Sequence, residues 1–370
     1  MVMNGSDDRD FRDASGWRAV TKQDLETPAL LVDLELMDAN LNRMASFFQT
    51  VPAKLRPHFK NHKCPDLAAR QLNAGAIGIT CATLREAECL VHHGVSSVLL
   101  ANEIVDSARI RRFVELGRLA DVIVCVDNEK VAAEFARVAR NANSQVGVLV
   151  DVDVGLHRCG VPPGEAAVRL ALSVAEKGLR FRGLMGYEGH VLRKAPGPDK
   201  EAAVATAMRP LMETKTCIEG KGIPVGIISV GGTGTYSISG RYPGVTEIQA
   251  GSYLLMDTDY RQCCTDFDPA LSVLSTVLSK TEGERIVVDA GLKWLSCERG
   301  VPAVKDLPGL ATRRLTAEHG IIDIQDRAAR VEVGDQIEFW VHYSDATVNL
   351  HEHIYGIRNG RVEEVFRVEG

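Results

Sequence analysis

Short apolar runs alternate with amphipathic, helix-like segments along the chain up to about residue 265. A first run covers 29–34, and a helical pattern follows near 36–48. The segments between later runs, such as 130–141, repeat apolar residues at i, i+3 and i+4, which predicts amphipathic helices. Eight further runs have the composition of buried strands: Lys54–Phe59, Ile77–Ala82, Ser97–Ala101, Val122–Val126, Gln145–Val152, Leu179–Tyr187, Ile227–Gly231 and Glu247–Tyr253.

Alternating strand and helix patterns are typical of an α/β fold with a parallel sheet. Eight strand–helix units over about 200 residues favour a (β/α)8 barrel of the TIM type, in which the sheet closes on itself. An open, doubly wound sheet is the competing arrangement, and the count of eight strands favours the barrel.

The pattern changes after about residue 265, where strand-like runs follow one another with few helices between them. Asn359-Gly360 is a strong cue for a β-hairpin. We therefore predict a barrel over 26–264 and a C-terminal β-rich domain over 265–370, with residues 1–25 as an N-terminal extension that joins the β domain or stays loose. The predicted strands of this domain are 270–279, 285–289, 336–342, 352–357 and 362–368.

Composition and charge narrow the class of protein. The chain has 370 residues, of which 45% are hydrophobic and 25% charged, as in ordinary globular proteins. Its net charge of −6 and its scattered basic residues give no footprint for nucleic acid. No apolar run approaches the roughly 20 residues that span a bilayer. The polar first 16 residues do not resemble a signal peptide, so we expect a cytoplasmic protein without membrane or nucleic-acid partners.

The nine cysteines form no Cys-x-x-Cys pair, and several, such as Cys125, lie inside apolar runs. We interpret them as small buried side chains in a reducing compartment, and cysteine spacing gives no support for a zinc site.

Polar motifs follow the predicted strands at the end where barrel enzymes place their sites. Lys60 follows the first barrel strand in the segment 56–63, RPHFKNHK. A lysine held there among basic groups can lose its proton and attack a carbonyl, forming a Schiff base. A charge on His58, His62 or Lys63 would depress the pKa of Lys60. A solvated basic loop is the alternative interpretation.

Glycine-rich motifs follow the seventh and eighth strands at 231–235 and 251–252. Glycines let backbone N–H groups approach an anion, and Thr233 or Thr235 can add a hydroxyl. Loops at these positions are a recurrent phosphate site in barrels, so we predict one here, with a flexible turn as the alternative.

Two further strand ends carry polar side chains. Arg158 follows the fifth strand, and Tyr187 closes the sixth together with Glu188 and His190. Arg158 is either a structural ion-pair partner or the group that faces the pyridine nitrogen of a cofactor. A permanently charged guanidinium there would keep that nitrogen unprotonated.

Together these motifs resemble the pyridoxal-phosphate enzymes of the alanine-racemase-like fold, specifically the D-threonine aldolase / D-serine dehydratase family. The likeness runs from about Thr27 to Val368. The matching segments are ETPALLVD at 26–33, RPHFKNHK at 56–63, ATLREAE at 82–88, RCG at 158–160, GGTG at 231–234, QAGSY at 249–253, DAGLK at 289–293 and EHG at 318–320.

The resemblance implies pyridoxal 5'-phosphate bound covalently to Lys60, a homodimer, and D-amino acid substrates with a β-hydroxyl group. It also implies that His58 and His319 carry protons during catalysis, with Lys60 as the third catalytic residue. The implied cofactor contacts are Lys60, Arg158, Tyr187, Gly232, Thr233, Gly234, Gly251, Ser252 and Tyr253.

The resemblance further implies a divalent metal (Mn, Mg or Zn) bound by a His-x-Cys or His-x-Asp pair before a Thr-x-Asn segment. Here the segment 340–350 reads WVHYSDATVNL. Asp345 fits the second ligand, whereas the first falls on Tyr343, with His342 one residue early. Neutral tyrosine is a poor ligand for a hard ion. Three interpretations stay open: His342 binds after a local shift, Tyr343 binds weakly or as a phenolate, or no metal is bound.

We therefore expect a lyase that splits a β-hydroxy-D-amino acid into glycine, or a relative, and an aldehyde, as D-threonine and 3-hydroxyaspartate aldolases do. A dehydratase that gives a 2-oxo acid and ammonia is the alternative, and the aspartate at 345 favours the aldolase. A racemase of this fold needs a second base on the opposite face of the substrate, usually a tyrosine of the partner subunit. No tyrosine lies between 265 and 342, so a racemase is disfavoured. A non-catalytic carrier of the cofactor is disfavoured by the long C-terminal segment.

Overall fold

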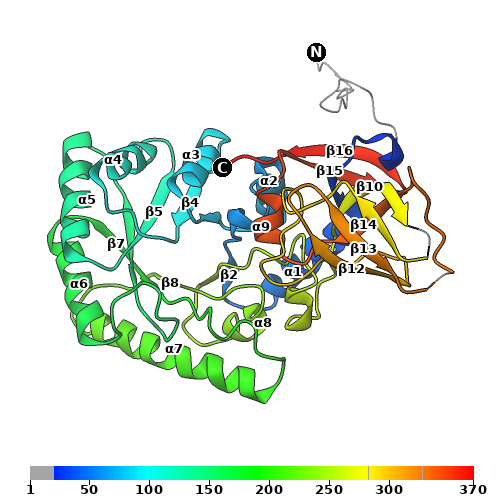
Figure 1. Cartoon of the computed structure of the whole chain (residues 1–370). Helices are drawn as coiled ribbons and strands as arrows, with labels where there is room; N and C mark the ends of the chain where they lie inside the picture. Colours follow the sequence, from blue (N-terminus) through cyan, green and yellow to red (C-terminus); the bar gives the residue numbers. More distant parts are fainter. Residues whose placement is uncertain (1–20, 282, 327) are drawn as a thin grey trace, which may run out of the picture. The chain divides into compact units, whose positions relative to one another are not determined.

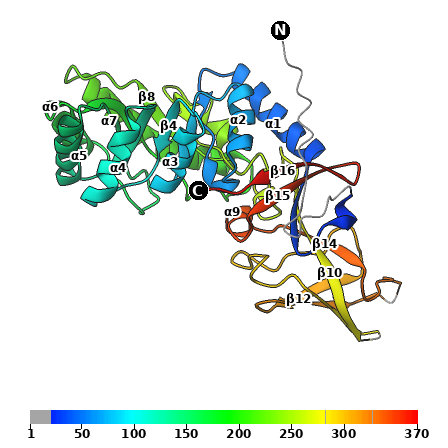
Figure 2. The same cartoon turned by 90° about the horizontal axis from the view of Figure 1, so that it is seen from above.

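The computed structural model describes residues 21–370 except 282 and 327, and the chain divides into two compact units. The barrel unit comprises Asp38–Asp268 and the last two residues, Glu369–Gly370. The β unit comprises the described residues up to Met37 and Pro269–Val368. Figures 1 and 2 show the two units in two views.

The barrel unit is built on eight parallel strands in one curled sheet, with the order β2-β9-β8-β7-β6-β5-β4-β3 (Figure 1). The prediction of an eight-stranded parallel sheet in an α/β fold is confirmed, and each predicted barrel strand overlaps an observed one. The strands are β2 (Lys54–Leu55), β3 (Ile79–Cys81), β4 (Ser97–Leu100), β5 (Asp121–Val126), β6 (Gly147–Asp151), β7 (Arg180–Met185), β8 (Ile227–Val230) and β9 (Glu247–Ile248).

The two ends of this strand order are joined by irregular backbone. Ile77 N–H donates to the Leu55 carbonyl over 2.9 Å, and Thr80 N–H donates to the Pro57 carbonyl over 2.8 Å. His58 and Thr80 also form an isolated parallel bridge. Because these bonds join residues in and next to β2 and β3, the two ends of the sheet are linked and do not form the two free edges of an open, doubly wound arrangement.

Helices connect the strands, as the helix-period segments predict. Capping side chains fix the first residues of two helices, because the Thr83 side chain accepts the N–H of Glu86 and the Asp106 side chain accepts the N–H of Arg109. Inside the sheet, Leu99, Ile123, Cys125, Leu149 and Met185 form a buried cluster. The helices are α1 (Leu34–Gln49), α2 (Pro65–Asn73), α3 (Leu84–His92), α4 (Ser107–Leu116), α5 (Glu129–Ala142), α6 (Glu165–Glu176), α7 (Pro198–Glu219) and α8 (Tyr236–Ser239), with short 3-10 turns η2 (Phe59–Asn61) and η3 (Tyr260–Gln262).

The β unit has one mixed sheet in the order β12-β13-β11-β10-β1-β15-β16, and β14 also pairs with β10. Asn359 and Gly360 have φ of 50° and 73° and connect β15 to β16, which confirms the predicted hairpin. The elements are η1 (Lys22–Asp24), β1 (Ala29–Asp33), β10 (Leu271–Thr281), β11 (Arg285–Val288), β12 (Leu310–Leu315), β13 (Gly320–Ile324), β14 (Gln336–Trp340), α9 (Ser344–Val348), β15 (His353–Arg358) and β16 (Arg361–Arg367).

The structure divides the chain differently from the predicted boundaries at 26 and 264. Strand β1 pairs with β10 and β15, so the barrel unit begins at Asp38 and not at residue 26. The barrel unit also extends to Asp268. Within the predicted extension 1–25, Lys22 N–H donates to the Gly360 carbonyl over 3.0 Å, so its end joins the β unit; its first 20 residues lie outside the described part.

Among the described residues, no helix combines the length and the apolar character needed to cross a membrane.

Candidate active site

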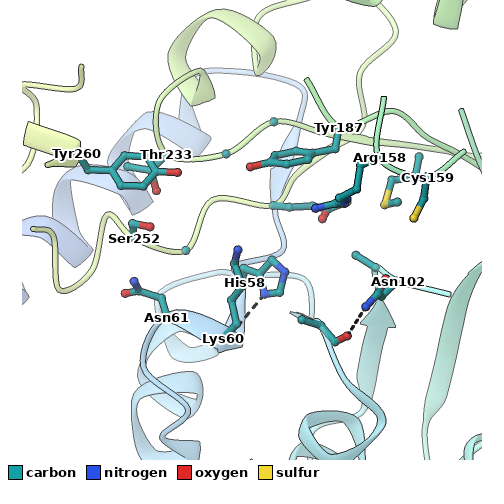
Figure 3. A pocket seen from close by; sticks show the side chains of 17 residues that line it. His58, Lys60, Asn61, Asn102, Arg158, Cys159, Tyr187, Thr233, Ser252 and Tyr260 are labelled. Carbon is teal, nitrogen blue, oxygen red and sulfur yellow. Dashed lines mark hydrogen bonds between the residues drawn. The ribbon is translucent and has the colours of Figure 1, made fainter. Parts of the chain in front are cut away.

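One pocket of the barrel unit collects side chains from the carboxyl ends of several strands (Figure 3). Figure 3 shows Lys60 and His58 facing Arg158 and Tyr187 across this pocket. Eight of the residues predicted from the sequence line it: Lys60, His58, Arg158, Tyr187, Gly232, Thr233, Gly251 and Ser252. Asn61, Asn102, Cys159, Gln249 and Tyr260 also line it and were not predicted.

Lys60 lies in the 3-10 turn η2, which follows β2 after residues 56–58. The turn is closed because the N–H groups of His62 and Lys63 both donate to the Phe59 carbonyl, over 3.1 and 2.8 Å. Phe59 is fully buried and anchors the turn, whereas Lys60 is half-buried and lines the pocket. The sequence around Lys60 thus presents the lysine on a short, fixed turn.

His58 caps this turn, and its Nδ1 accepts the N–H of Lys60 over 3.4 Å (Figure 3). Burial, followed by the nearby charges of Lys60 and Arg158, lowers the pKa of His58 well below its usual value. His58 is therefore neutral at neutral pH, and because its Nδ1 accepts the Lys60 N–H, its single ring proton lies on Nε2.

His62 does not supply the positive charge that we expected beside Lys60. Burial lowers the pKa of His62 to about 4, so its ring is neutral. Its Nδ1 accepts the Cys64 N–H over 3.0 Å, and its Nε2 meets Gln71 Oε1 at 3.1 Å. Gln71 in turn donates to the hydroxyl of Tyr253 over 2.9 Å. His62 and Tyr253 therefore form a buried network behind the pocket.

The glycine loop after β8 is held from behind by the carboxylate of Glu188, which is fully buried. Glu188 accepts the Gly231 N–H over 2.9 Å, the Thr235 hydroxyl over 2.8 Å and the Ser239 hydroxyl over 2.5 Å. The sequence places Glu188 at the end of a strand but gives no sign of this role.

The loops after β8 and β9 are also tied to each other. Thr233 Oγ1 accepts the Tyr253 N–H over 3.0 Å. A Cβ atom at Gly251 would lie 2.8 Å from the His58 carbonyl oxygen, so only glycine lets this loop pass so close to the Lys60 turn. The predicted contact Gly234 does not line the pocket; a Cβ there would lie 2.5 Å from the Leu192 carbonyl.

Arg158 lies with its guanidinium 5.5 Å from the centre of the Tyr187 ring, in a cation–π contact. A buried acid lies near it: burial, and then the neighbouring Glu103, raise the pKa of Asp151 above its usual range, while Arg158 opposes the shift. Glu103 and Asp151 were not predicted as site residues.

The remaining predicted residues belong to the β unit. His319 is exposed, His342 Nε2 lies 3.2 Å from the Arg299 carbonyl oxygen, and Asp345 lies on α9. In the described part of the chain, three side chains of metal-binding types converge at one place, and these are Cys89, His93 and Glu369. Neither His342 nor Asp345 belongs to this group. Metal binding at Asp345 stays a prediction.

Comparison with known proteins agrees with this geometry. The family model for the alanine racemase N-terminal domain matches residues 32–259, and a serine dehydratase domain model matches 270–357. D-threonine aldolase from Arthrobacter sp is 35% identical over 349 residues, which are 93% of this chain and 92% of that protein. The chain belongs to the D-threonine aldolase / D-serine dehydratase family. The resemblance seen in the sequence is confirmed.

Other members of the family show two kinds of activity. 3-Hydroxy-D-aspartate aldolase from Paracoccus denitrificans (strain Pd 1222) is 31% identical over 94% of this chain and 92% of its own length. D-threo-3-hydroxyaspartate dehydratase from Delftia sp. (strain HT23) is also 31% identical, over 84% of this chain and 86% of its own. Among solved structures, D-threonine aldolase from Filomicrobium marinum has a TM-score of 0.91 at 34% identity and covers 95% of this chain and 97% of that chain.

Proposed function

We propose that the protein is a pyridoxal-phosphate-dependent lyase that splits a β-hydroxy-D-amino acid into glycine, or a relative, and an aldehyde. One observation carries the proposal: Lys60, the glycine loops after β8 and β9, and Arg158 line a single pocket. Two aldolases among the relatives support the retro-aldol reaction.

The residues of the pocket fit pyridoxal 5'-phosphate. The loop at 231–233 is held in place by Glu188, and Gly232, Thr233 and Ser252 all line the pocket, where their N–H and hydroxyl groups would hold a phosphate. Arg158 would face the ring nitrogen, and Lys60 Nζ would bind the cofactor covalently. When bound, this cofactor draws electrons from the α-carbon of an amino acid.

The chain's own groups would then manage protons. The amino group of Lys60 lies at the pocket and would move a proton at the α-carbon of the substrate. His58 would carry the proton of the β-hydroxyl group as the bond between the α- and β-carbons breaks, and it would take that proton on Nδ1 in place of the long Lys60 N–H contact. The roles of His319, His342 and Asp345 stay predictions of the resemblance. Among the described residues, no group of three metal-binding types of side chain converges at Asp345.

The covalent role of Lys60 has a direct test. Borohydride treatment of the holoprotein, followed by peptide mapping, should find the cofactor attached to Lys60. Lys60→Ala should abolish the visible absorption band of the bound cofactor, at roughly 410–430 nm. A band that persists in this variant, or a label on another lysine, would remove Lys60 from the mechanism.

A dehydratase is the second candidate, because D-threo-3-hydroxyaspartate dehydratase is among the relatives. In that reaction Lys60 would remove the α-proton and the β-hydroxyl group would leave. Incubation with D-threonine, D-serine and 3-hydroxyaspartate distinguishes the two, because the aldolase yields an aldehyde or glyoxylate, and the dehydratase a 2-oxo acid and ammonia. Formation of 2-oxo acid and ammonia alone would overturn the aldolase.

The resemblance also leads us to propose a homodimer. Sedimentation equilibrium of the holoprotein tests this, and a mass of about 40.3 kDa, that of one chain, would contradict it.

A further inference from the structure

Three side chains of the types that bind metal ions converge in the barrel unit outside the pocket. Cys89 lies on α3 and His93 directly follows that helix, four residues later, so both lie on one face. Glu369 joins them from the far end of the chain. Figures 1 and 2 both show the C-terminal end beside α3.

The distances between the three side chains suit a shared ion. Cys89 Sγ lies 3.7 Å from Glu369 Oε2. His93 Nε2 lies 3.8 Å from the same carboxylate oxygen, and one ligand atom from each residue lies within 4.8 Å of the others. Ligands bound to zinc at about 2.0–2.3 Å in a tetrahedron lie about 3.3–3.6 Å apart. The three ligand atoms, which all lie within 4.8 Å of one another, would therefore move closer together around the ion.

The histidine is already oriented for this role. His93 Nδ1 lies 2.9 Å from the Cys89 carbonyl oxygen. A backbone carbonyl in this position accepts the Nδ1 proton and leaves the lone pair on Nε2, as the outer partners of metal-bound histidines do. Nε2 is the nitrogen that faces Glu369.

We propose that Cys89, His93 and Glu369 form a site for a zinc-like transition-metal ion, separate from the amino-acid pocket. Sulfur, imidazole and carboxylate ligands select zinc or cobalt over the hard ions magnesium and manganese. The side chains of His93 and Glu369 are 45% and 31% exposed, which gives the ion an entry path and leaves room for water as a fourth ligand. Binding replaces the thiol proton of Cys89, which leaves to solvent.

A metal bound by Glu369 would hold the last residues of the chain beside the turn that carries Lys60. Glu369 N–H donates to the Lys63 carbonyl over 2.7 Å, three residues after Lys60. A Cβ atom at Gly370 would lie 3.3 Å from the Phe59 ring, so the chain end passes beside this buried ring. The ion would therefore stabilise the barrel unit at the segment that carries the catalytic lysine.

The test uses cobalt and zinc as probes on the full-length holoprotein after treatment with a chelator. Cobalt should produce a thiolate charge-transfer absorption in the near ultraviolet, seen in the difference spectrum with and without the metal. Cys89→Ser should abolish it, whereas Cys217→Ser, an exposed cysteine on α7, should keep it. Asp345→Asn should also keep it, which separates this site from a metal at Asp345.

Zinc affinity provides the second measurement, by competition with a chromophoric chelator. His93→Gln and Glu369→Gln should each weaken zinc binding by more than the roughly 10–100-fold that loss of an outer partner costs. The proposal is overturned if wild type shows no thiolate absorption, if the absorption survives in Cys89→Ser, or if both ligand variants bind zinc as wild type does. None of these outcomes depends on the lyase activity, so the proposed function is tested separately.

Discussion

Glu188 shows how a single buried charge shapes the glycine loop after β8. Its carboxylate accepts hydrogen bonds from Gly231, Thr235 and Ser239. In Glu188→Gln an amide nitrogen would face at least one of these donors. Because a hydrogen bond to a charged group contributes about 1.5–3 kcal/mol, we expect the loop to lose its fixed shape.

We therefore expect Glu188→Gln to weaken binding of pyridoxal 5'-phosphate by about 10-fold or more, which corresponds to about 1.4 kcal/mol. Absorbance titration of the cofactor-free variant measures this. Glu176→Gln, an exposed glutamate on α6, is the matched control and should bind as wild type does. Equal affinity in Glu188→Gln and the control would contradict the role of Glu188.

Gly251 is a second single-residue test, because it sets the distance between two loops. In Gly251→Ala the new Cβ would lie 2.8 Å from the carbonyl oxygen and 2.9 Å from the Cβ of His58. His58 and Lys60 would be pushed out of position. We expect kcat/KM to fall, with a loss of stability of about 1–3 kcal/mol, as for other overpacked sites.

The control for this variant is Gly226→Ala, whose Cβ would have its nearest neighbour, the Arg182 carbonyl oxygen, at 3.6 Å. Steady-state kinetics and thermal unfolding of the two variants measure the effect. A Gly251→Ala enzyme with wild-type kcat/KM would show that the Lys60 turn tolerates displacement.

At the scale of elements, the barrel strands were predictable because each is a short apolar run. Lys60, Arg158 and the glycine loops were then expected together because barrel enzymes place their sites at the carboxyl ends of the strands. The first run, 29–34, was assigned to the wrong unit. Strand β1 is buried, with Ala29 to Val32 all inaccessible, so it has no alternation that would tell which sheet it enters. Strands β12 and β13 were missed, and a register shift between Thr312 and Arg314 breaks the period of two there.

The residues that hold the site in shape were harder to predict than the residues that line the pocket. Lys60 and Gly232 have recognisable neighbours in sequence, whereas Glu188 and Asp151 act through burial and distant partners. The same limit explains the error on His62: its sequence context is basic, but its ring is fully buried and neutral.

His62 lies between η2 and α2, and its burial makes the stability of this segment depend on pH. Its pKa falls from 6.5 to about 4 on folding, so the unfolded chain binds more protons between these values. The stabilisation is complete above pH 6.5 and is lost as the pH falls toward 4. Its upper limit, from the size of the shift, is about 3 kcal/mol.

We expect His62→Asn to be less stable than wild type at pH 7 and the difference to shrink as the pH falls to 4.5. Urea unfolding, followed by the helical circular dichroism signal, measures the gap, and the other titrating groups cancel in it. His92→Asn, which replaces an exposed histidine on α3, should follow wild type throughout. A gap that is constant from pH 7 to 4.5 would argue against a neutral, buried His62.

At the scale of the whole molecule, the chain begins and nearly ends in the β unit and forms the barrel unit between. Separate segments of the β unit therefore have to be held together by contacts that are distant in sequence. Glu338 on β14 is one such point: its carboxylate pairs with Lys22 and with Lys305 at 3.0 Å, and accepts the Ser272 hydroxyl over 2.7 Å.

These partners overcome the cost of burial and lower the pKa of Glu338 from 4.5 to about 2. A depressed carboxyl pKa stabilises the fold above pH 4.5, and this contribution is lost as the pH falls toward 2. We expect Glu338→Gln to destabilise the β unit by up to about 3 kcal/mol at pH 7, and the difference from wild type to narrow below pH 4.5. Tryptophan fluorescence during urea unfolding reports on this unit, because Trp294 and Trp340 lie in it, while Trp17 lies outside the described residues.

Glu332 provides the matched control, because it pairs with Lys280 at the surface with its side chain 72% exposed. Surface pairs of this kind contribute about 0–1 kcal/mol, so Glu332→Gln should leave the fluorescence midpoint almost unchanged. If Glu338→Gln and Glu332→Gln shift the midpoint equally, the buried carboxylate does not hold the segments of the β unit together. If only Glu338→Gln shifts the midpoint, and this shift becomes smaller at acidic pH, the charge of Glu338 links Lys22 to strands that lie some 250 to 320 residues later in the sequence.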